Sequence, residues 1–185
     1  MLKLLNTLSR QKEDFLPIKT KKVGIFVCGP TVYDYSHIGH ARTYVIFDVI
    51  AKYLRYKGYQ VKFVMNITDI DDKIIQRAEK EKKTWKELSE FFEKDFMEDI
   101  KKLGIDSISK FTRATEHIPE ILNQVQTLID RGFAYRTEDG IYFDISKFSE
   151  YGKLARRTIG QAEDAVSRID ESVKKRNKGD FVLWK

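Results

Sequence analysis

The chain has 185 residues, of which 42% are hydrophobic and 34% charged, enough apolar material for one domain or one domain with an insertion. Its net charge of +6 is compatible with a polyanionic partner and equally with a lysine-rich solvated surface. The single cysteine excludes an internal disulfide, and no apolar run approaches the roughly 20 residues that cross a bilayer. We therefore exclude membrane functions. We expect a cytoplasmic protein, because the start of the chain also lacks the apolar core of a signal peptide.

The first predicted element is a strand from Val23 to Val27 that ends at Cys28. A helix is predicted from Ile38 to Lys57 and a second strand from Gln60 to Met65. A strand, a helix and a strand in this order form a βαβ unit, which predicts an α/β fold with a Rossmann-type parallel sheet. Ligands bind at the carboxyl ends of such strands, so Cys28 and the segment Asn66-Ile67-Thr68 are predicted to share one crevice.

The apolar residues of the predicted helix form a stripe that we expect to face the sheet, at Val45, Ile46, Val49, Ile50, Tyr53 and Leu54. Asp71 and Asp72 begin a helix that runs to about Lys83, and we interpret these acids, with Asp69, as helix caps more readily than as a metal cluster.

A capping box at Thr84 to Glu87 starts the next helix, which ends at Gly104. Its expected core residues are Trp85, Leu88, Phe92, Phe96, Ile100 and Leu103. A third helix is predicted from about Thr115 to Arg131, and Phe133–Tyr135 with Ile141–Phe143 predict a hairpin. The stretch from Ser146 to Asp180 is charged and carries no clear assignment.

The strongest local motif is His37-Ile38-Gly39-His40, which opens a helix directly after a strand and a Gly-Pro loop. Two imidazoles one helical turn apart, beside the N–H groups of a helix amino terminus, can donate hydrogen bonds to a phosphate during nucleotidyl transfer. Gly39 has no side chain, so a nucleotide can approach the backbone there. Four residues alone leave open the alternative that the histidines only occupy a helix start.

Five segments extend this motif into a family resemblance. The run Cys28-Gly-Pro-Thr-Val-Tyr-Asp-Tyr-Ser-His-Ile-Gly-His-Ala-Arg-Thr43 resembles the signature region of class I cysteinyl-tRNA synthetases. Similar segments follow in the order and spacing of that family, at Asn66 to Lys73, Arg113 to His117, Asp170 to Lys174 and Asp180 to Lys185. The resemblance covers essentially the whole chain.

The resemblance implies roles for individual residues. His37, Gly39 and His40 are expected to bind ATP, with its magnesium, and the histidines to stabilise attack by the cysteine carboxylate on the α-phosphate. Cys28 is expected to be one of four ligands of a zinc ion that binds the substrate thiolate. The pocket for the amino acid and its adenylate is expected to include Gly29, Thr31, Thr43, Asn66 and Thr68.

Zinc has a physical rationale, because a hydrophobic pocket separates cysteine from serine or alanine by only about 1–3 kcal/mol, whereas zinc binds sulfur much better than a hydroxyl. The single cysteine cannot complete such a site, so the remaining ligands are expected to lie outside this chain. Without the resemblance, a lone cysteine at a strand end is more simply a small buried apolar residue.

The same resemblance implies the domain organisation and the partners. Residues 1–112 are expected to form the first half of the nucleotide-binding catalytic domain, and residues 113–185 a connective insertion and return segment. The anticodon-binding domain is expected to be absent from this chain. The implied partners are ATP, L-cysteine and tRNA(Cys), with a monomeric full-length protein. The basic residues Arg156-Arg157 and Lys174-Lys175-Arg176 are candidates for tRNA phosphate contacts, although such runs are commonly only solvated.

Three hypotheses follow for the activity. The chain is part of a full cysteine–tRNA ligase, or a standalone paralogue that binds nucleotide or tRNA without aminoacylation, or a small nucleotidylyltransferase that uses the same histidines on another acceptor. The third hypothesis is the weakest, because the segments after Thr68 also match a synthetase.

Overall fold

The computed structural model describes residues 2–156 and 174–185. It contains two compact units. One is Leu16–Ile118, and the other combines Met1–Phe15 with Pro119–Lys185. Among the helices of the described residues, none combines the length and the apolar character needed to span a bilayer.

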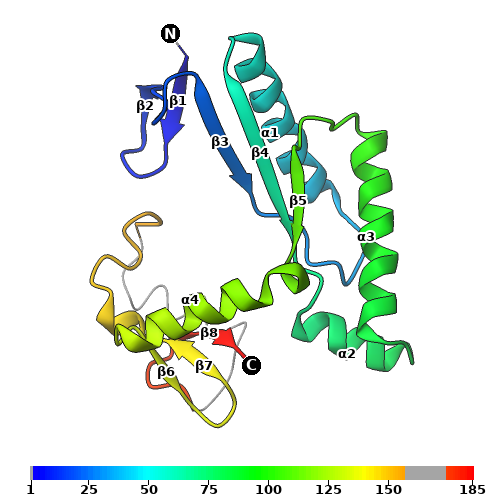
Figure 1. Ribbon diagram of the computed structural model, residues 1–185, viewed down its shortest axis with the longest axis vertical. Helices are drawn as coiled ribbons and strands as arrows, with labels where there is room; N and C mark the ends of the chain where they lie inside the picture. The colour runs from blue at the N-terminus through cyan, green and yellow to red at the C-terminus, as the bar shows by residue number, and fades with distance from the viewer. Residues whose placement is uncertain (1, 157–173) are drawn as a thin grey trace. The chain divides into compact units, whose positions relative to one another are not determined.

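The first unit is built on three parallel strands in the order β3 (Lys22–Val27), β4 (Gln60–Ile67) and β5 (Lys110–Arg113) (Figure 1). The two predicted strands and their parallel pairing are confirmed. β5 gives no periodic signal, because it has four residues and none of them is fully buried. Burial alternates along β4, where Phe63, Met65 and Ile67 are completely buried. Alternation of this kind means that β4 buries one face against the core.

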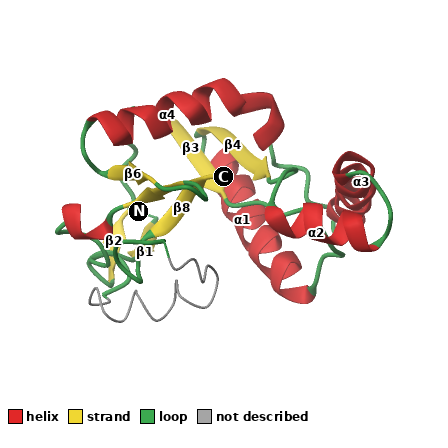
Figure 2. Ribbon diagram, turned by 90° about the horizontal axis from the view of Figure 1, so that it is seen from below, coloured by secondary structure: helices red, strands yellow, loops and turns green. Residues whose placement is uncertain are grey.

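Three helices belong to this unit: α1 (Ile38–Tyr56), α2 (Asp72–Lys80) and α3 (Trp85–Lys102). Figure 2 shows them grouped on one side of the strands β3 and β4. The predicted sheet-facing stripe of α1 is largely wrong. Of its six residues only Leu54 is fully buried, and Val45, Ile46, Val49 and Tyr53 are exposed. The residues of α1 that the structure buries are instead Tyr44, Asp48, Ala51 and Leu54.

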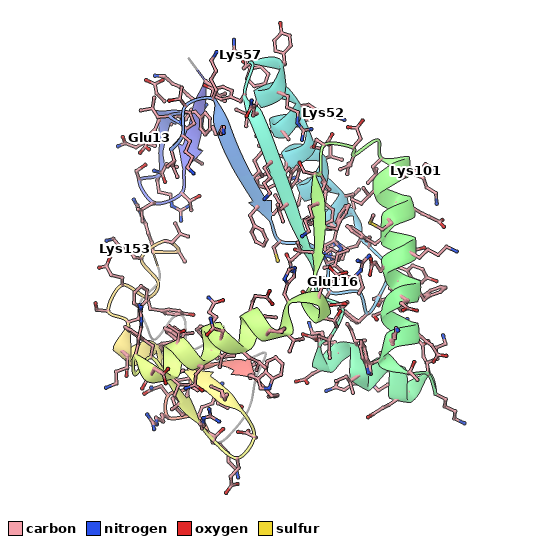
Figure 3. All side chains as sticks on the ribbon, viewed as in Figure 1. Glu13, Lys52, Lys57, Lys101, Glu116 and Lys153 are labelled. Carbon is pink, nitrogen blue, oxygen red and sulfur yellow. The ribbon has the colours of Figure 1, made fainter. Side chains whose placement is uncertain are left out.

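The buried Asp48 explains this error, because a carboxylate at a core position hides the true phase of the apolar pattern. One oxygen of Asp48 accepts hydrogen bonds from the Ser107 backbone N–H at 3.0 Å and from the Ser107 hydroxyl at 2.5 Å. The other pairs at 2.7 Å with Lys52, which also pairs with Asp106 at 2.8 Å and is labelled in Figure 3. Burial by itself raises the pKa of Asp48, but the hydrogen bonds from Lys52 and Ser107 outweigh burial and hold that pKa below its ordinary value. The network therefore fastens α1 to the loop before β5.

The ends of α2 and α3 follow their capping residues. Asp71 caps α2 by accepting from Lys73 N–H at 2.9 Å, and α2 ends at Lys80, earlier than predicted. The predicted capping box of α3 is confirmed, with Thr84 accepting from the backbone of Glu87. The central core residues of α3 are buried as predicted at Leu88, Phe92, Phe96 and Ile100. Trp85 and Leu103 were expected in the core but are 39% and 47% exposed, because they stand at the two ends of the helix, beyond the sheet-facing turns.

The structure differs from two predictions near β5, the capping role of Asp69 and the start of the third helix. Asp69 caps no helix. It accepts instead from the Thr115 backbone N–H at 3.0 Å and from the Thr115 hydroxyl at 2.5 Å. The helix predicted from Thr115 to Arg131 divides into a 3-10 turn, η1 (Ala114–His117), and the helix α4 (Ile118–Asp130). Pro119 lies in the first turn of α4, where a missing N–H costs little.

The second unit contains two small antiparallel sheets. β1 (Lys3–Asn6) and β2 (Gln11–Asp14) form an amino-terminal hairpin, so the expectation that ordered structure begins at Val23 is wrong. Both strands are almost entirely exposed, which leaves no apolar alternation to detect. The predicted hairpin is confirmed as β6 (Ala134–Arg136) and β7 (Ile141–Phe143), and β8 (Phe181–Trp184) adds a third strand.

A buried carboxylate organises the sheet of β6, β7 and β8. Asp180 is completely buried and accepts from the Tyr135 hydroxyl at 2.7 Å, from Ile145 N–H at 3.0 Å and from Asn177 N–H at 3.0 Å. Ile145 begins the short 3-10 turn η2 (Ile145–Lys147). Asp180 therefore joins β6, η2 and the segment before β8. The part of the stretch Ser146 to Asp180 that covers residues 157–173 lies outside the described residues.

Candidate active site

The carboxyl ends of β3 and β4 meet at Gly29. Its backbone N–H donates to the Asn66 side-chain oxygen at 2.9 Å. A Cβ on Gly29 would lie 1.8 Å from the Asn66 backbone oxygen, far inside van der Waals contact. Only glycine therefore allows the two chains to approach this closely. The neighbouring Cys28 is exposed, with its thiol directed to the Gly29 carbonyl at 3.7 Å.

A backbone bridge extends this contact beyond the strands. Val32 N–H donates to the Thr68 carbonyl at 3.1 Å, and Thr68 N–H donates to the Pro30 carbonyl at 3.0 Å. Thr31 and Thr68 are the paired residues of this parallel bridge. The Asn66 amide also donates to the Thr68 hydroxyl at 3.3 Å. The structure thus brings together the predicted pocket residues Cys28, Gly29, Thr31, Asn66 and Thr68.

The two histidines form the amino-terminal cap of α1. Nδ1 of His37 accepts from Gly39 N–H at 3.1 Å, and Nδ1 of His40 accepts from His37 N–H at 3.3 Å. The rings stack, with centroids 3.9 Å apart and planes 19° from parallel. The reciprocal pattern is a capping box in which imidazoles replace the usual Ser or Thr and Glu.

This cap fixes the tautomer of both rings. A neutral imidazole whose Nδ1 accepts a hydrogen bond carries its proton on Nε2. Burial, followed by the neighbouring His37, lowers the pKa of His40 and so favours the neutral form. Each ring therefore presents an Nε2–H group as a donor. A pair of fixed donors suits an anionic oxygen such as that of a phosphate.

The helix amino terminus differs from the sequence-based expectation in one respect. The backbone N–H groups of Gly39 and His40 already donate to the side chain and the carbonyl of His37. The Thr43 hydroxyl donates back to the Gly39 carbonyl at 3.1 Å, so Thr43 supports the first turn of α1. The donors of this site are consequently the imidazoles more than the backbone of the first turn.

Tyr44 is a site residue that sequence reasoning missed. It is 3% exposed, and its ring lies parallel to His40 at 6.1 Å and edge-on to Phe96 at 5.7 Å. Burial, together with the Cys28 thiol nearby, raises the pKa of Tyr44 to about 12. Tyr44 thus lies near both the cysteine and the histidine pair. Its spacing of four residues from His40 was the available signal, since such residues share a helix face.

A cavity of about 280 Å³ adjoins the histidines on the side of α3, lined by residues that include His37, His40, Tyr44, Phe96, Asp99 and Leu103. Ligand clefts usually measure about 300–1,000 Å³. The cavity lies at the lower end of that range.

Of the four zinc ligands expected from the family resemblance, only Cys28 can be named in this chain. Within residues 2–156 and 174–185, no group of three or more His, Cys, Asp or Glu side chains is arranged to hold a metal ion. A catalytic zinc site needs about three protein ligands. The described residues therefore do not fit a zinc ion by themselves.

The basic residues proposed for phosphate contact are partly engaged elsewhere. Lys174 pairs with Glu138, and the Arg176 guanidinium lies 4.1 Å from the centroid of the Tyr135 ring. Arg157 lies outside the described residues.

Comparison with known proteins identifies the family of the chain. Residues 14–185 match the family model described as tRNA synthetases class I (C) catalytic domain. The chain is 51% identical over 187 residues to a cysteine–tRNA ligase of Methanococcus maripaludis, and 50% identical over 188 residues to that of Thermodesulfovibrio yellowstonii. Both matches cover 100% of this chain but only 39% and 38% of the relatives. The chain thus spans about two fifths of the length of the curated relatives that it matches.

A solved structure confirms the fold. Mycobacterium tuberculosis methionyl-tRNA synthetase, bound by methionyl-adenylate, superposes with a TM-score of 0.55 at 24% identity. The superposition covers 61% of this chain and 23% of that one. The α/β fold with a parallel sheet is accordingly that of a class I synthetase catalytic domain.

Proposed function

Because the chain belongs to the family of class I tRNA synthetase catalytic domains of the cysteine type, we propose that it supplies the ATP-binding half of a cysteine–tRNA ligase. In the proposed reaction a carboxylate oxygen of L-cysteine attacks the α-phosphorus of ATP, with magnesium on the phosphates. Pyrophosphate leaves, and cysteinyl-adenylate remains for transfer to tRNA(Cys). We place this reaction in the cytoplasm.

The observation that carries the proposal is the pair of Nε2–H donors. Nδ1 of His37 and of His40 is occupied by the helix cap, so the protons face away from the helix backbone. Negative charge grows on the non-bridging oxygens of the α-phosphate during attack, and donors fixed in advance stabilise it. In the proposal, Gly39 leaves room for the nucleotide beside the cap.

The pocket at the ends of β3 and β4 is proposed to hold the amino acid. Gly29, Thr31, Asn66 and Thr68 are tied to one another by hydrogen bonds and the backbone bridge, which gives the pocket a rigid floor. Cys28 lies exposed beside it. Its role as a ligand of zinc for the substrate thiolate rests on the family resemblance and needs ligands from beyond the described residues.

Two substitutions of His40 separate its cap from its donor. In His40→Asn the side-chain amide can still accept from His37 N–H but has nothing at the position of Nε2. In His40→Gln the amide nitrogen can occupy the Nε2 position, and the side-chain oxygen is the acceptor that a capping box commonly uses at this helix position. Loss of a hydrogen bond to a charged group costs about 1.5–3 kcal/mol, or roughly 10- to 150-fold in affinity.

We expect His40→Asn to weaken binding of a sulfamoyl analogue of cysteinyl-adenylate by that factor, measured by calorimetry on the 185-residue chain. His40→Gln should bind more tightly than His40→Asn, because its amide can still donate a hydrogen bond from the Nε2 position. His117→Asn is the matched control, because His117 stands in η1, outside the proposed site. Analogue binding that His40→Asn leaves unchanged would reject the donor role.

ATP–pyrophosphate exchange on the same chain tests which molecule accepts the adenylyl group. Exchange that depends on cysteine supports the proposal. Exchange that depends on another acceptor supports the nucleotidylyltransferase alternative instead.

A further inference from the structure

The loop between β3 and α1 is held at a second place by Arg77 on α2. One guanidinium nitrogen, Nη1, donates to the Tyr33 carbonyl at 2.8 Å and pairs with Asp34 at 2.8 Å. Nε pairs with Glu81 at 2.8 Å, and the guanidinium carbon lies 4.6 Å from the centroid of the Phe92 ring. Arg77 thus joins the loop to both α2 and α3.

The charges of this cluster are stable around neutral pH. The hydrogen bond from Arg77, followed by that from Tyr35 N–H, lowers the pKa of Asp34. The hydrogen bonds with Glu81 and Asp34 raise the pKa of Arg77, which is protonated in any case. The Arg77 side chain is 29% exposed, so water screens the pairs only in part. A lysine in its place has no planar fork to reach several partners at once.

The position of the cluster along the chain links it to the histidines. The backbone bridge from Val32 to Thr68 fixes the start of the loop, and the cap at His37 begins only three residues after Asp34. Tyr35 adds an edge-on contact with Phe92 at 5.2 Å between centroids. Arg77 therefore holds the middle of the short segment that leads from the amino-acid pocket into α1.

We propose that Arg77 is a positioning residue for the histidine pair: by holding Tyr33 and Asp34 it sets the direction in which the loop enters α1. Within the described part of the chain, the hydrogen bonds and ion pairs of Arg77 reach Tyr33, Asp34 and Glu81 and none of the proposed pocket residues. The inference rests on the proposed function, since it assigns to Arg77 the alignment of the nucleotide donors.

The hold on the loop is tested without any ligand. We expect Arg77→Gln to speed hydrogen exchange of the amides of residues 33–37 by about tenfold, because a charged hydrogen bond of about 1.5–3 kcal/mol is lost. Amides in the middle of α3 should exchange as in the wild type. The matched control is Lys83→Gln, since Lys83 pairs with the same Glu81 and, within the described residues, has no hydrogen bond or ion pair with the loop. Unchanged exchange at residues 33–37 would overturn the proposal.

Alignment is tested by affinity for the cysteinyl-adenylate analogue. Misplacement of binding groups by about 1 Å costs up to about a hundredfold, so Arg77→Gln should raise the Kd by about ten- to a hundredfold at a temperature where the variant is still fully folded. Arg77→Lys should recover only part of the affinity, whereas Lys83→Gln should bind as the wild type does. A wild-type Kd in Arg77→Gln, despite a loosened loop, would also overturn the inference. If the wild-type chain does not bind the analogue, the proposed function fails. The hydrogen-exchange experiment still decides whether Arg77 holds the loop.

Discussion

Both units of the chain contain a three-stranded sheet, but the centres of the two sheets differ in kind. The sheet of Leu16–Ile118 buries a continuous apolar cluster that includes Phe63, Met65 and Ile67. The sheet of β6, β7 and β8 is organised by the fully buried Asp180 and its donors. An apolar centre can be exchanged for another of similar volume, whereas a buried carboxylate requires every donor to be in place. The first kind of centre is visible in a sequence, and the second kind is not.

The largest expected effect breaks the polar centre. Asp180→Asn keeps the shape of the side chain but replaces one carboxylate oxygen by an NH₂ group, which then faces either Ile145 N–H or both the Tyr135 hydroxyl and Asn177 N–H. We expect a loss of about 3 kcal/mol in the free energy of unfolding, because buried donors are left unsatisfied. Urea unfolding measures the loss, and hydrogen exchange shows where protection falls.

Protection should fall in β6 to β8 and persist in β3 and β4. Glu150→Gln is the control, because Glu150 belongs to an exposed pair with Lys153 and should change the stability by less than about 0.5 kcal/mol. Equal loss of protection in both units would show that the two centres do not act separately.

A smaller loss of stability is expected in the parallel sheet, where the backbone at Gly29 lies close to the backbone at Asn66. Gly29→Ala places a methyl group against the Asn66 carbonyl and should cost about 2 kcal/mol, the middle of the range for overpacking. Gly24→Ala, within β3, is the matched control, because nothing lies within 4 Å of its added Cβ. The thermal unfolding midpoint and the affinity for the cysteinyl-adenylate analogue should both fall for Gly29→Ala and stay unchanged for Gly24→Ala. Equal behaviour of the two variants would contradict the close approach of the strand ends.

The smallest effect compares one tyrosine from each unit at high pH. Burial raises the pKa of Tyr44 and of Tyr135 to about 12, with help from the Cys28 thiol in the first case and the Asp180 hydrogen bond in the second. The folded chain then keeps protons that the unfolded chain loses above pH 10. The contribution of this pKa difference to the free energy of unfolding is fully present below pH 10 and is lost as the pH rises toward 12.

Tyr44→Phe should therefore reduce this alkaline loss by up to about 1.4 kcal/mol per pH unit, read from urea unfolding between pH 9 and 12. At pH 7 it should cost little, because no hydrogen bond of the Tyr44 hydroxyl is found within residues 2–156 and 174–185. Tyr135→Phe should cost about 1 kcal/mol more at pH 7, since Asp180 loses a donor. A pH dependence that Tyr44→Phe leaves unchanged would contradict the burial of this hydroxyl.

Sequence reasoning reached the parts of the fold that repeat or that carry strong local signals. The strands β3 and β4, the helices α1 and α3 and the hairpin of β6 and β7 follow from apolar alternation, glycine stops and a capping box. The strands β1, β2, β5 and β8 have four residues each, too few for a period to emerge, whereas the three-residue strands β6 and β7 are marked by the turn residues Asp139 and Gly140 between them. The phase of α1 failed because Asp48 occupies a core position.

The sequence by itself determined the family and the βαβ unit, and it proposed the two histidines and Cys28 as site residues, because these depend on local pattern and order along the chain. Only the tertiary structure decided how the histidines are used. Their Nδ1 atoms are consumed by the cap of α1, and this fixes the Nε2–H groups as donors. It also revealed Tyr44 beside them and Arg77 behind the loop. The spacing of Tyr44 from His40 only places the two on one helix face, and Arg77 comes from a helix distant in sequence, so their contacts depend on the tertiary fold.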